Sequence, residues 1–240
     1  MPFGVHDVVW TREKAIRFWN QLAARDTTED SYFSKQVGDL VLDLAEKDVD
    51  LTRGRILDFG CGPGFLVEKL VNRGALTEAV DFSPASIEAT RKRLAGQAKF
   101  AGATEIQALP TPYEDARFDT VFFLETIEHL LADELEPTVA ELARITKPGG
   151  SIVITTRNEE DLEKDMQICP DCGCKFHRVQ HQSSWSATSL TRFMQKHGFE
   201  VERTRTLTLR PYSRWSQVFD LVSTVLRTPK INLMYVGRRR

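Results

Sequence analysis

The sequence predicts an α/β protein with a doubly wound sheet, and three features support this fold class. Apolar segments typical of strands alternate with helical segments between residues 55 and 156. The segment 118–124 is almost wholly apolar, as expected for a strand that is buried on both faces of a sheet. Residues 56–59 run directly into a glycine-rich turn that precedes a helix. A chain of 240 residues has room for one such domain with an elaboration or two.

The bulk composition is that of an ordinary globular protein. The hydrophobic content is 41% and the formal net charge is −2. No stretch approaches the roughly 20 apolar residues of a membrane span. The chain begins without the basic and apolar segments of a secretory signal, so we expect a cytoplasmic protein.

The charge is unevenly distributed, because residues 201–240 hold nine Lys or Arg and two Asp or Glu. A basic tail could face an anionic substrate or a lipid headgroup, which would allow peripheral membrane contact. We favour a solvated end instead, above all for residues 238–240. Residues 213–227 have an apolar helical face that could contact a lipid-linked substrate, although packing on the sheet or over the acceptor is the simpler interpretation.

The predicted elements follow one another in a regular order. Two helical segments, residues 11–25 and one that starts near residue 31, precede the first strand. Further strands are expected at residues 75–80, 98–106, 118–124, 151–156, 199–209 and 231–236. The helices between them are expected at residues 63–73, 84–94, 133–146 and 186–197. A Lys-Pro-Gly-Gly stop signal at 147–150 separates the third of these helices from the strand at 151.

The glycine-rich turn after the first strand is the feature that points to a ligand. Gly60, Gly62 and Gly64 allow a tight backbone close to a ligand, because a Cβ atom there would collide with it. The dinucleotide-binding pattern needs a third glycine where this chain has Phe65, so that interpretation fails. Asp58, just before the turn, suits a cationic ligand better than a pyrophosphate.

Residues 56–64 resemble the first motif of the class I S-adenosylmethionine-dependent methyltransferases, and Asp81-Phe82-Ser83-Pro84 resembles the second. The resemblance implies a Rossmann-like sheet of seven strands with the last strand antiparallel. The Thr-Arg-Asn sequence at 156–158 departs from the Thr-Pro-Asn of the quinone-biosynthesis-type members, which the core otherwise resembles.

Strand ends of this sheet supply the expected cofactor site. Asp81 can accept hydrogen bonds from both ribose hydroxyls, although Asp81 or Ser83 could instead cap the next helix. The family motif implies that Glu105 binds the adenine amino group and that Ile106 covers the ring. The expected residues are Asp58, Gly60, Cys61, Gly62, Gly64, Asp81, Phe82, Glu105, Ile106 and Leu124.

The resemblance divides the chain into four parts. Residues 51–156 form the S-adenosylmethionine-binding core, and residues 186–240 complete its sheet. Residues 1–50 form a helical lid that helps to select the acceptor, as such helices do in the family, or they simply pack on the sheet. Residues 157–185 are an insertion rich in cysteine and histidine.

The fourth strand leads into the expected catalytic residues, which are Glu125, Glu128 and His129. Methyl transfer from a sulfonium is an in-line displacement, in which alignment alone supplies about 7–11 kcal/mol. A hydroxyl acceptor must also lose a proton, and His129 is the candidate base unless it merely packs at the start of the helix.

The spacing Glu-x-x-Glu-His also resembles the metal motif of small-RNA 2′-O-methyltransferases. Those enzymes add a further histidine downstream, a position that His181 could fill. Two carboxylates and two imidazoles would bind Mg2+ or Mn2+ and polarise a hydroxyl acceptor. A similar Glu-His-Leu stretch occurs in metal-free quinone-type methyltransferases.

The insertion is a second candidate metal site. Three cysteines within residues 169–174 of a cytosolic protein indicate metal binding rather than disulfides. The favoured zinc ligands are Cys169, Cys172, His177 and His181, with Cys174 in reserve. Some bacterial class I methyltransferases carry a similar Cys-Pro-x-Cys-Gly-x-x-Phe-His insertion. His181 cannot serve both metals, so the two sites compete, and unliganded cysteines in a mobile loop are the alternative.

These features predict an S-adenosylmethionine-dependent methyltransferase that acts on an oxygen of a small-molecule, lipid-linked or glycan acceptor. The first alternative is a methyltransferase-like subunit or sensor that binds the cofactor without turnover. The second is a metal-assisted RNA 2′-O-methyltransferase, which is weaker because the basic tail has no recognisable nucleic-acid reader motif. The sequence carries no signal for an oligomeric state.

Overall fold

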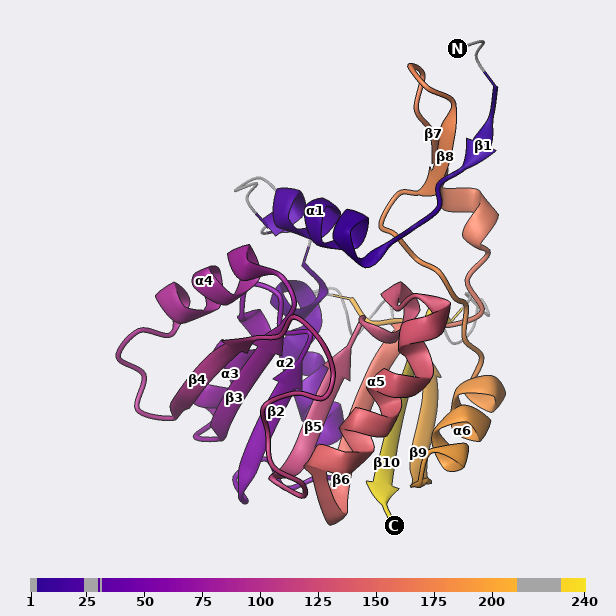
Figure 1. Ribbon diagram of the computed structural model, residues 1–240. Coiled ribbons are helices and arrows are strands. Elements are labelled where there is room, and N and C mark those ends of the chain that lie inside the picture. Colours follow the sequence, from indigo (N-terminus) through magenta and orange to yellow (C-terminus); the bar gives the residue numbers. More distant parts are fainter. Residues whose placement is uncertain (1–3, 24–29, 31, 211–229) are drawn as a thin grey trace.

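The computed structural model describes residues 4–23, 30, 32–210 and 230–240. Its main body is a seven-stranded sheet with the order β4-β3-β2-β5-β6-β10-β9 (Figure 1). The strands are β2 (Arg55–Phe59), β3 (Leu76–Asp81), β4 (Phe100–Glu105), β5 (Phe118–Leu124), β6 (Thr146–Arg157), β9 (Phe199–Leu207) and β10 (Asn232–Arg239). Strand β10, the last in the chain, is antiparallel to both of its neighbours, whereas the other pairs are parallel. The predicted doubly wound fold is confirmed.

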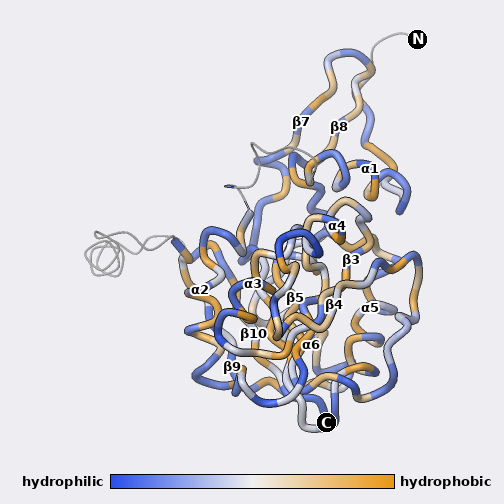
Figure 2. Tube along the Cα trace, turned by 90° about the vertical axis from the view of Figure 1, so that its left-hand side faces the viewer, coloured by the Kyte–Doolittle hydropathy of each residue, from blue (hydrophilic) through white to orange (hydrophobic). Residues whose placement is uncertain are grey.

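Helices cover both faces of this sheet. On one face lie α2 (Phe33–Ala45) and α3 (Phe65–Asn72), which pack on β2, β5 and β6 through a buried apolar cluster. The short helix α4 (Pro84–Arg93) joins α3 through a further cluster. The opposite face carries α5 (Ala132–Ile145) and α6 (Ala187–Lys196). Figure 2 shows the hydrophobic residues concentrated between these layers, where burial of apolar surface stabilises the fold.

Local signals account for several helix boundaries. Ser83 accepts a hydrogen bond from the backbone of Ser86 and caps α4, as one interpretation of the sequence predicted. Ser186 caps α6 in a reciprocal capping box with Ser189. Helix α3 begins at Phe65, after Gly64 in the left-handed conformation. The helices therefore start where the turn chemistry allows.

One expectation about a strand end is wrong. Strand β6 begins at Thr146, so the Lys-Pro-Gly-Gly signal lies inside the strand rather than before it. At the end of the chain Arg238 and Arg240 are exposed, as expected of a solvated end, although the backbone of β10 extends to Arg239 and pairs with β9. Arg238 forms an ion pair with Glu202, and Arg239 donates to the Thr146 carbonyl. Strand pairing and these partners hold the basic end on the sheet.

A small second sheet projects from the main body as an arm (Figure 1). It contains β1 (His6–Asp7), β8 (Cys174–His177) and β7 (Met166–Ile168), in that order. The short helix η3 (Leu162–Asp165) precedes β7. The arm thus joins the first described residues to the insertion, a pairing that the sequence did not indicate.

Helix α1 (Arg12–Ala23) lies beside the ends of the strands that face the arm (Figure 1). The Ser83 hydroxyl donates to the side chain of Asn20 at 2.6 Å, which ties α1 to the start of α4. The helix expected at 213–227 lies outside the described residues. Within the described part of the chain, no helix is long and apolar enough to cross a membrane.

Candidate functional site

The expected cofactor residues lie together at the carboxyl ends of four neighbouring strands. Asp58 and Asp81 end or nearly end β2 and β3, and both are buried, with 3% and 8% of their surface exposed. Asp81 is paired in register with Glu105, the last residue of β4. Leu124 closes β5 next to them in the sheet order. In open α/β sheets this edge is where ligands bind.

The glycine turn leaves one open position. Gly60, Gly62 and Gly64 all have positive φ angles, of 81°, 51° and 82°. A Cβ atom on Gly60 or Gly64 would lie 2.6 Å from Thr126 or 2.8 Å from Thr90, so these two glycines permit close packing within the protein. A Cβ on Gly62 would make an ordinary van der Waals contact with the Tyr32 ring at 3.7 Å, without a clash. Gly62 is therefore the position of the turn where the backbone is not packed tightly against the protein.

Burial raises the pKa of both acids beside this turn. It raises the pKa of Asp58 to about 8, with the negative charge of Asp81 as a second cause. Burial also raises the pKa of Asp81 to about 6, although the backbone N–H groups of Ser83, Gly62 and Phe82 oppose this. Two of these donors lie at 2.8 and 2.9 Å from its oxygens. Two buried acids without a basic partner suit a cationic ligand.

The other expected cofactor residues differ in whether their side chains face the core or the solvent. The Cys61 thiol points into an apolar cluster with Val67 and Ile87, so only its backbone borders the turn. Ile106 belongs to the main core, and the partly buried Phe82 packs against that core. The half-buried Glu105 carboxylate accepts a hydrogen bond from Gln107. Sequence patterning did not indicate that the thiol of Cys61 faces inward.

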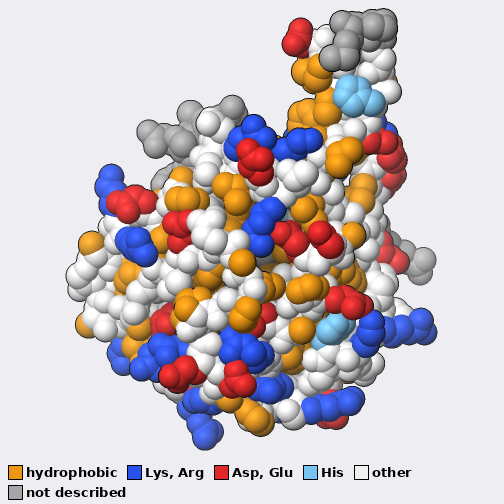
Figure 3. All heavy atoms as spheres, viewed as in Figure 1, with side chains coloured by type: hydrophobic (Ala, Val, Ile, Leu, Met, Phe, Trp, Pro, Cys, Tyr) orange, Lys and Arg blue, Asp and Glu red, His pale blue; other side chains and the backbone are white. Residues whose placement is uncertain are grey.

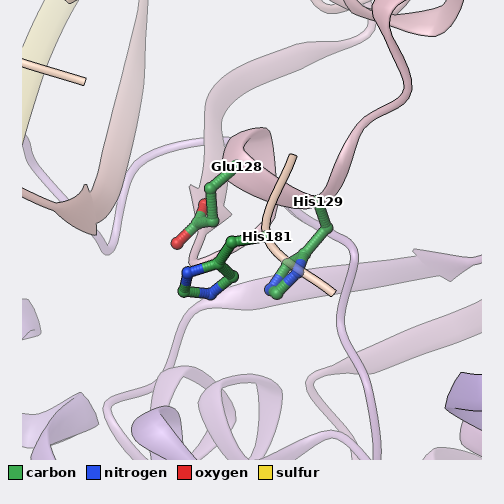
Figure 4. A group of neighbouring side chains, drawn as sticks. All are labelled: Glu128, His129 and His181. Atoms are coloured by element: carbon green, nitrogen blue, oxygen red, sulfur yellow. The ribbon is translucent and has the colours of Figure 1, made fainter. Parts of the chain in front are cut away.

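The expected catalytic residues meet at the turn after β5. Glu128 and His129 belong to the short helix η2 (Ile127–His129), and His181 approaches them from the insertion (Figure 4). Ligand atoms of these three side chains all lie within 4.8 Å of one another. Glu125 precedes η2 with a φ of 44°, and its N–H donates to the Thr155 carbonyl at 2.9 Å. The rings of His129 and His181 are 4.7 Å apart.

The returning chain of the insertion is hydrogen-bonded to this turn. The backbone N–H of Gln182 donates to the Glu128 carbonyl at 2.7 Å. The Gln180 amide donates to the His129 carbonyl at 2.9 Å and accepts from the indole of Trp19 at 2.8 Å. The edge of the His129 ring also meets Trp19, with the ring centres 4.7 Å apart. These contacts place His181 beside the two η2 side chains and bring α1 against them.

Several buried polar atoms of this cluster have no hydrogen-bond partner among the described residues. They are Oε1 of Glu125, both carboxylate oxygens of Glu128 and Nδ1 of His129. Burial raises the pKa of Glu125 to about 7, and burial together with the charge of Glu125 raises the pKa of Glu128 well above its ordinary value. Burial and the neighbouring His181 lower the pKa of His129 to about 3. Unpartnered carboxylate and neutral imidazole atoms in one place are a donor set that fits a divalent cation.

Glu160 and His177 surround the other side of His181. Glu160 is bonded to Nδ1 of His181, and both side chains are 8% exposed. The His177 ring stacks on His181 with centres 4.6 Å apart, and its Nδ1 accepts from the His181 N–H at 3.1 Å. Sequence reasoning missed Glu160, because no motif spacing connects it with His181.

The structure does not bring the four expected zinc ligands together. Cys169 and Cys172 lie at the tip of the β7–β8 hairpin, whereas His177 is at the opposite end of β8 and His181 lies beyond it. Three residues of strand span roughly 10 Å, which exceeds a shared coordination sphere. The described residues contain two groups suited to metal binding, Glu128-His129-His181 and Glu160-His177-His181, and neither includes a cysteine.

Known proteins resemble this chain in sequence and in fold. A model of the methyltransferase domain matches residues 30–204. A protein of Aromatoleum aromaticum named ubiquinone biosynthesis O-methyltransferase is 31% identical over 151 residues, which are 61% of this chain and 59% of that protein. The match thus covers less than two thirds of the relative's length.

Two solved structures extend the likeness to nearly the whole chain. The [4+2]-cyclase SpnF has a TM-score of 0.70 at 14% identity, covering 99% of this chain and 98% of its own. The 1,6-didemethyltoxoflavin-N1-methyltransferase of Burkholderia thailandensis, solved with its substrate and S-adenosylhomocysteine, has a TM-score of 0.67 at 13% identity, with coverages of 98% and 93%. At these identities the likeness concerns the fold alone.

Proposed function

The chain belongs to the class I methyltransferases that use S-adenosylmethionine, and we propose that it methylates a hydroxyl group of a small-molecule acceptor with the help of a divalent cation. The observation that carries the metal-assisted chemistry is the convergence of Glu128, His129 and His181 with unpartnered buried atoms. The two features together support metal binding. Three neighbouring ligand residues are common on protein surfaces without a metal, but buried ligand atoms without hydrogen-bond partners are rare.

The cofactor would bind at the strand edge formed by β2, β3 and β4. Asp58 would supply the negative charge for the cationic part, Asp81 would accept from the ribose hydroxyls, and Gly62 would allow the close backbone approach. Glu105 and Ile106 are proposed for the adenine ring, as the family motif implies. Helix α1 would act as a lid over this edge, since it contacts both α4 and the His129 ring.

The metal would be held by Glu128, His129 and His181, with the Glu125 carboxylate close by. A divalent cation supplies Lewis-acid polarisation, which lowers the pKa of a bound hydroxyl. The low pKa of His129 keeps its ring neutral, so this residue serves better as a ligand than as the sole proton acceptor. The position of the His181 ring, which lies beside η2 and away from the cysteines, supports its assignment to this site.

The acceptor class rests on the name of the relative and on the charge of the site. That relative is named for O-methylation in ubiquinone biosynthesis, which suggests a phenolic hydroxyl, free or lipid-linked, as the acceptor here. A ribose 2′-hydroxyl of RNA is the second candidate, favoured by the assembled Glu-x-x-Glu-His and His181 side chains. Both acceptors are hydroxyls that must lose a proton.

Release of S-adenosylhomocysteine by the EDTA-treated full chain tests the proposal. A prenylated catechol, a matched aromatic amine and a short RNA would be compared with and without Mg2+ or Mn2+. We expect turnover of a hydroxyl acceptor that requires the cation. Turnover of the amine alone, or full turnover in EDTA, would overturn it. Tight cofactor binding without any turnover would support a non-catalytic subunit instead.

Matched variants separate the metal site from general damage. Glu128→Gln and His181→Ala should abolish cation-dependent turnover while S-adenosylmethionine binding, measured by calorimetry, stays within a few-fold of the parent. Glu88→Gln, an exposed acid of α4, is the control and should behave as the parent protein. Equal activity in Glu128→Gln and Glu88→Gln would contradict the metal-assisted mechanism.

A further inference from the structure

The arm is too small to be held together by an apolar core. Its strands contribute two, three and four residues, and the side chains along β1 and most of β7 are exposed. Hydrophobic side chains are exposed on the arm (Figure 3). Val5 is 58% exposed and Ile168 is 50% exposed. All three cysteines of the arm are free thiols. Small elements of this kind usually depend on a disulfide or a bound metal.

The turn at the arm tip brings three thiols to one end of the arm. The N–H of Gly173 donates to the Cys169 carbonyl at 2.9 Å, and Gly173 has a φ of 77° that favours glycine. Cys172 lies within this turn, between Cys169 just after β7 and Cys174 at the start of β8.

Strand pairing places two further ligands beside this turn. The Cys169 N–H donates to the Cys174 carbonyl at 2.9 Å, so these cysteines face each other across the hairpin. On the other side of β8, His6 is paired in register with Cys174, and its N–H donates to the Gly173 carbonyl at 3.1 Å. Residues paired across neighbouring strands project their side chains to the same face of the sheet.

We propose that Cys169, Cys172, Cys174 and His6 bind a structural zinc ion at the tip of the arm. Three thiolates and one imidazole are a common ligand set of closed, tetrahedral zinc sites. The set differs from the one that sequence spacing favoured, because His177 and His181 lie at the other end of β8. It also leaves His181 to the η2 cluster, so the two metal sites no longer compete.

Side-chain rotation would complete the site. No three of the four ligand atoms lie within 4.8 Å in the described structure, and His6 Nδ1 is 3.0 Å from the Gly4 carbonyl. Cys172 and His6 are exposed and can change rotamer without disturbing a core. A Cβ at Gly173 would lie 2.4 Å from the Gly4 carbonyl, so β1 already packs tightly on the turn. The bound ion would tie the first strand of the chain to the insertion.

The zinc content of the purified full chain and its cobalt-substituted spectrum test this site. We expect one tightly bound zinc per chain, released by a thiol-specific mercurial. Cobalt should give sulfur-to-metal charge-transfer absorption, which the η2 cluster, having no thiol, cannot produce. This spectral band distinguishes the arm site from the proposed catalytic cation, whatever the outcome for methyl transfer.

Substitutions at each ligand complete the test. Cys169→Ser, Cys172→Ser, Cys174→Ser and His6→Gln should each lose most of the zinc and change the cobalt spectrum. His197→Gln, a histidine on the main body, is the matched control and should retain both. Unchanged far-UV circular dichroism and cofactor affinity would show that the body stays folded. Absence of a thiolate band in the parent, or full zinc retention with an unchanged spectrum in His6→Gln or any cysteine variant, would overturn the assignment.

Discussion

The Glu160 carboxylate is bonded to Nδ1 of His181, and this contact decides which nitrogen of the ring remains available. Since Nδ1 is engaged, Nε2 is the atom left for a cation beside Glu128 and His129. Burial alone would raise the pKa of Glu160, but the hydrogen bond and charge of His181 bring it below its ordinary value. Glu160 is therefore an ionised positioning residue for the proposed metal site.

Glu160→Gln should weaken divalent cation binding by about 10–100-fold, the usual effect of removing a carboxylate behind a histidine ligand. The amide oxygen can still accept a hydrogen bond from Nδ1, so the ring stays in place. The negative charge that makes Nε2 a stronger metal ligand is lost. Calorimetric titration with Mn2+ measures the effect. Glu159→Gln, an exposed neighbour, is the control and should bind as the parent does. Identical Mn2+ affinity in both variants would rule out the positioning role.

Gly62→Ala should impair S-adenosylmethionine binding far more than it impairs folding. The new methyl group meets no protein atom within 3.7 Å, and the left-handed φ costs about 1–2 kcal/mol. The methyl group would occupy the space that the cofactor needs, so we expect at least a tenfold loss of affinity by calorimetry.

Gly60→Ala provides the contrast, because its methyl group would lie 2.6 Å from Thr126. That variant should lose more stability in urea unfolding than Gly62→Ala. A parent-like cofactor affinity in Gly62→Ala would mean that the open side of the turn is not the binding face.

S-adenosylmethionine affinity should rise with pH between about 6 and 8. Asp58 has a pKa of about 8 and holds a proton in the free protein at neutral pH, whereas a bound cation favours its ionised form. Binding would therefore release a proton, and the affinity should increase by up to about tenfold per pH unit. Calorimetry in two buffers of different ionisation enthalpy counts that proton.

The same raised pKa has a consequence for the unliganded protein. Its native state keeps a proton on Asp58 that the unfolded chain releases near pH 4, so stability should fall as the pH rises from about 4 to about 8. Asp58→Asn should flatten both pH profiles. S-adenosylhomocysteine, which lacks the sulfonium charge, should show a shallower dependence. A pH-independent affinity in the parent protein would refute the charge argument.

The main body could be predicted from the sequence because its signals are local. The apolar run of β5, the glycine turn after β2 and the caps at Ser83 and Ser186 each act within a few residues. The arm could not be predicted from the sequence. Strand β1 pairs with β8, at residues 174–177, and neither segment has the apolar alternation that predicts a strand. Long-range pairing depends on the assembled fold rather than on local spacing.

The residues of the candidate site likewise divide into those predicted from local spacing and those that depend on long-range contacts. Glu128 and His129 are neighbours in one short helix, so their spacing alone brought them together, whereas Glu125 precedes that helix with a φ of 44° and is not among the converging ligand atoms. Glu160 reaches His181 only because Glu159 adopts a φ of 48° and its N–H bonds to the Trp185 carbonyl at 2.8 Å. The Cys61 thiol was assigned to the cofactor site by its position in the turn, but its side chain faces the core. Side-chain direction in a tight turn is decided by packing around it.

Gln180→Ala should loosen the proposed lid. Gln180 is 1% exposed and bridges the Trp19 indole to the His129 carbonyl. Removing its amide leaves these two groups without their partner, and an unsatisfied buried group costs about 1–3 kcal/mol. We expect a loss of stability of that order in urea unfolding, together with faster hydrogen exchange in α1. Gln167→Ala, at an exposed position of the arm, is the control and should change neither. If α1 exchanged at the parent rate in Gln180→Ala, Gln180 would not be what couples this helix to the insertion, and the lid would have to be held by its contact with α4.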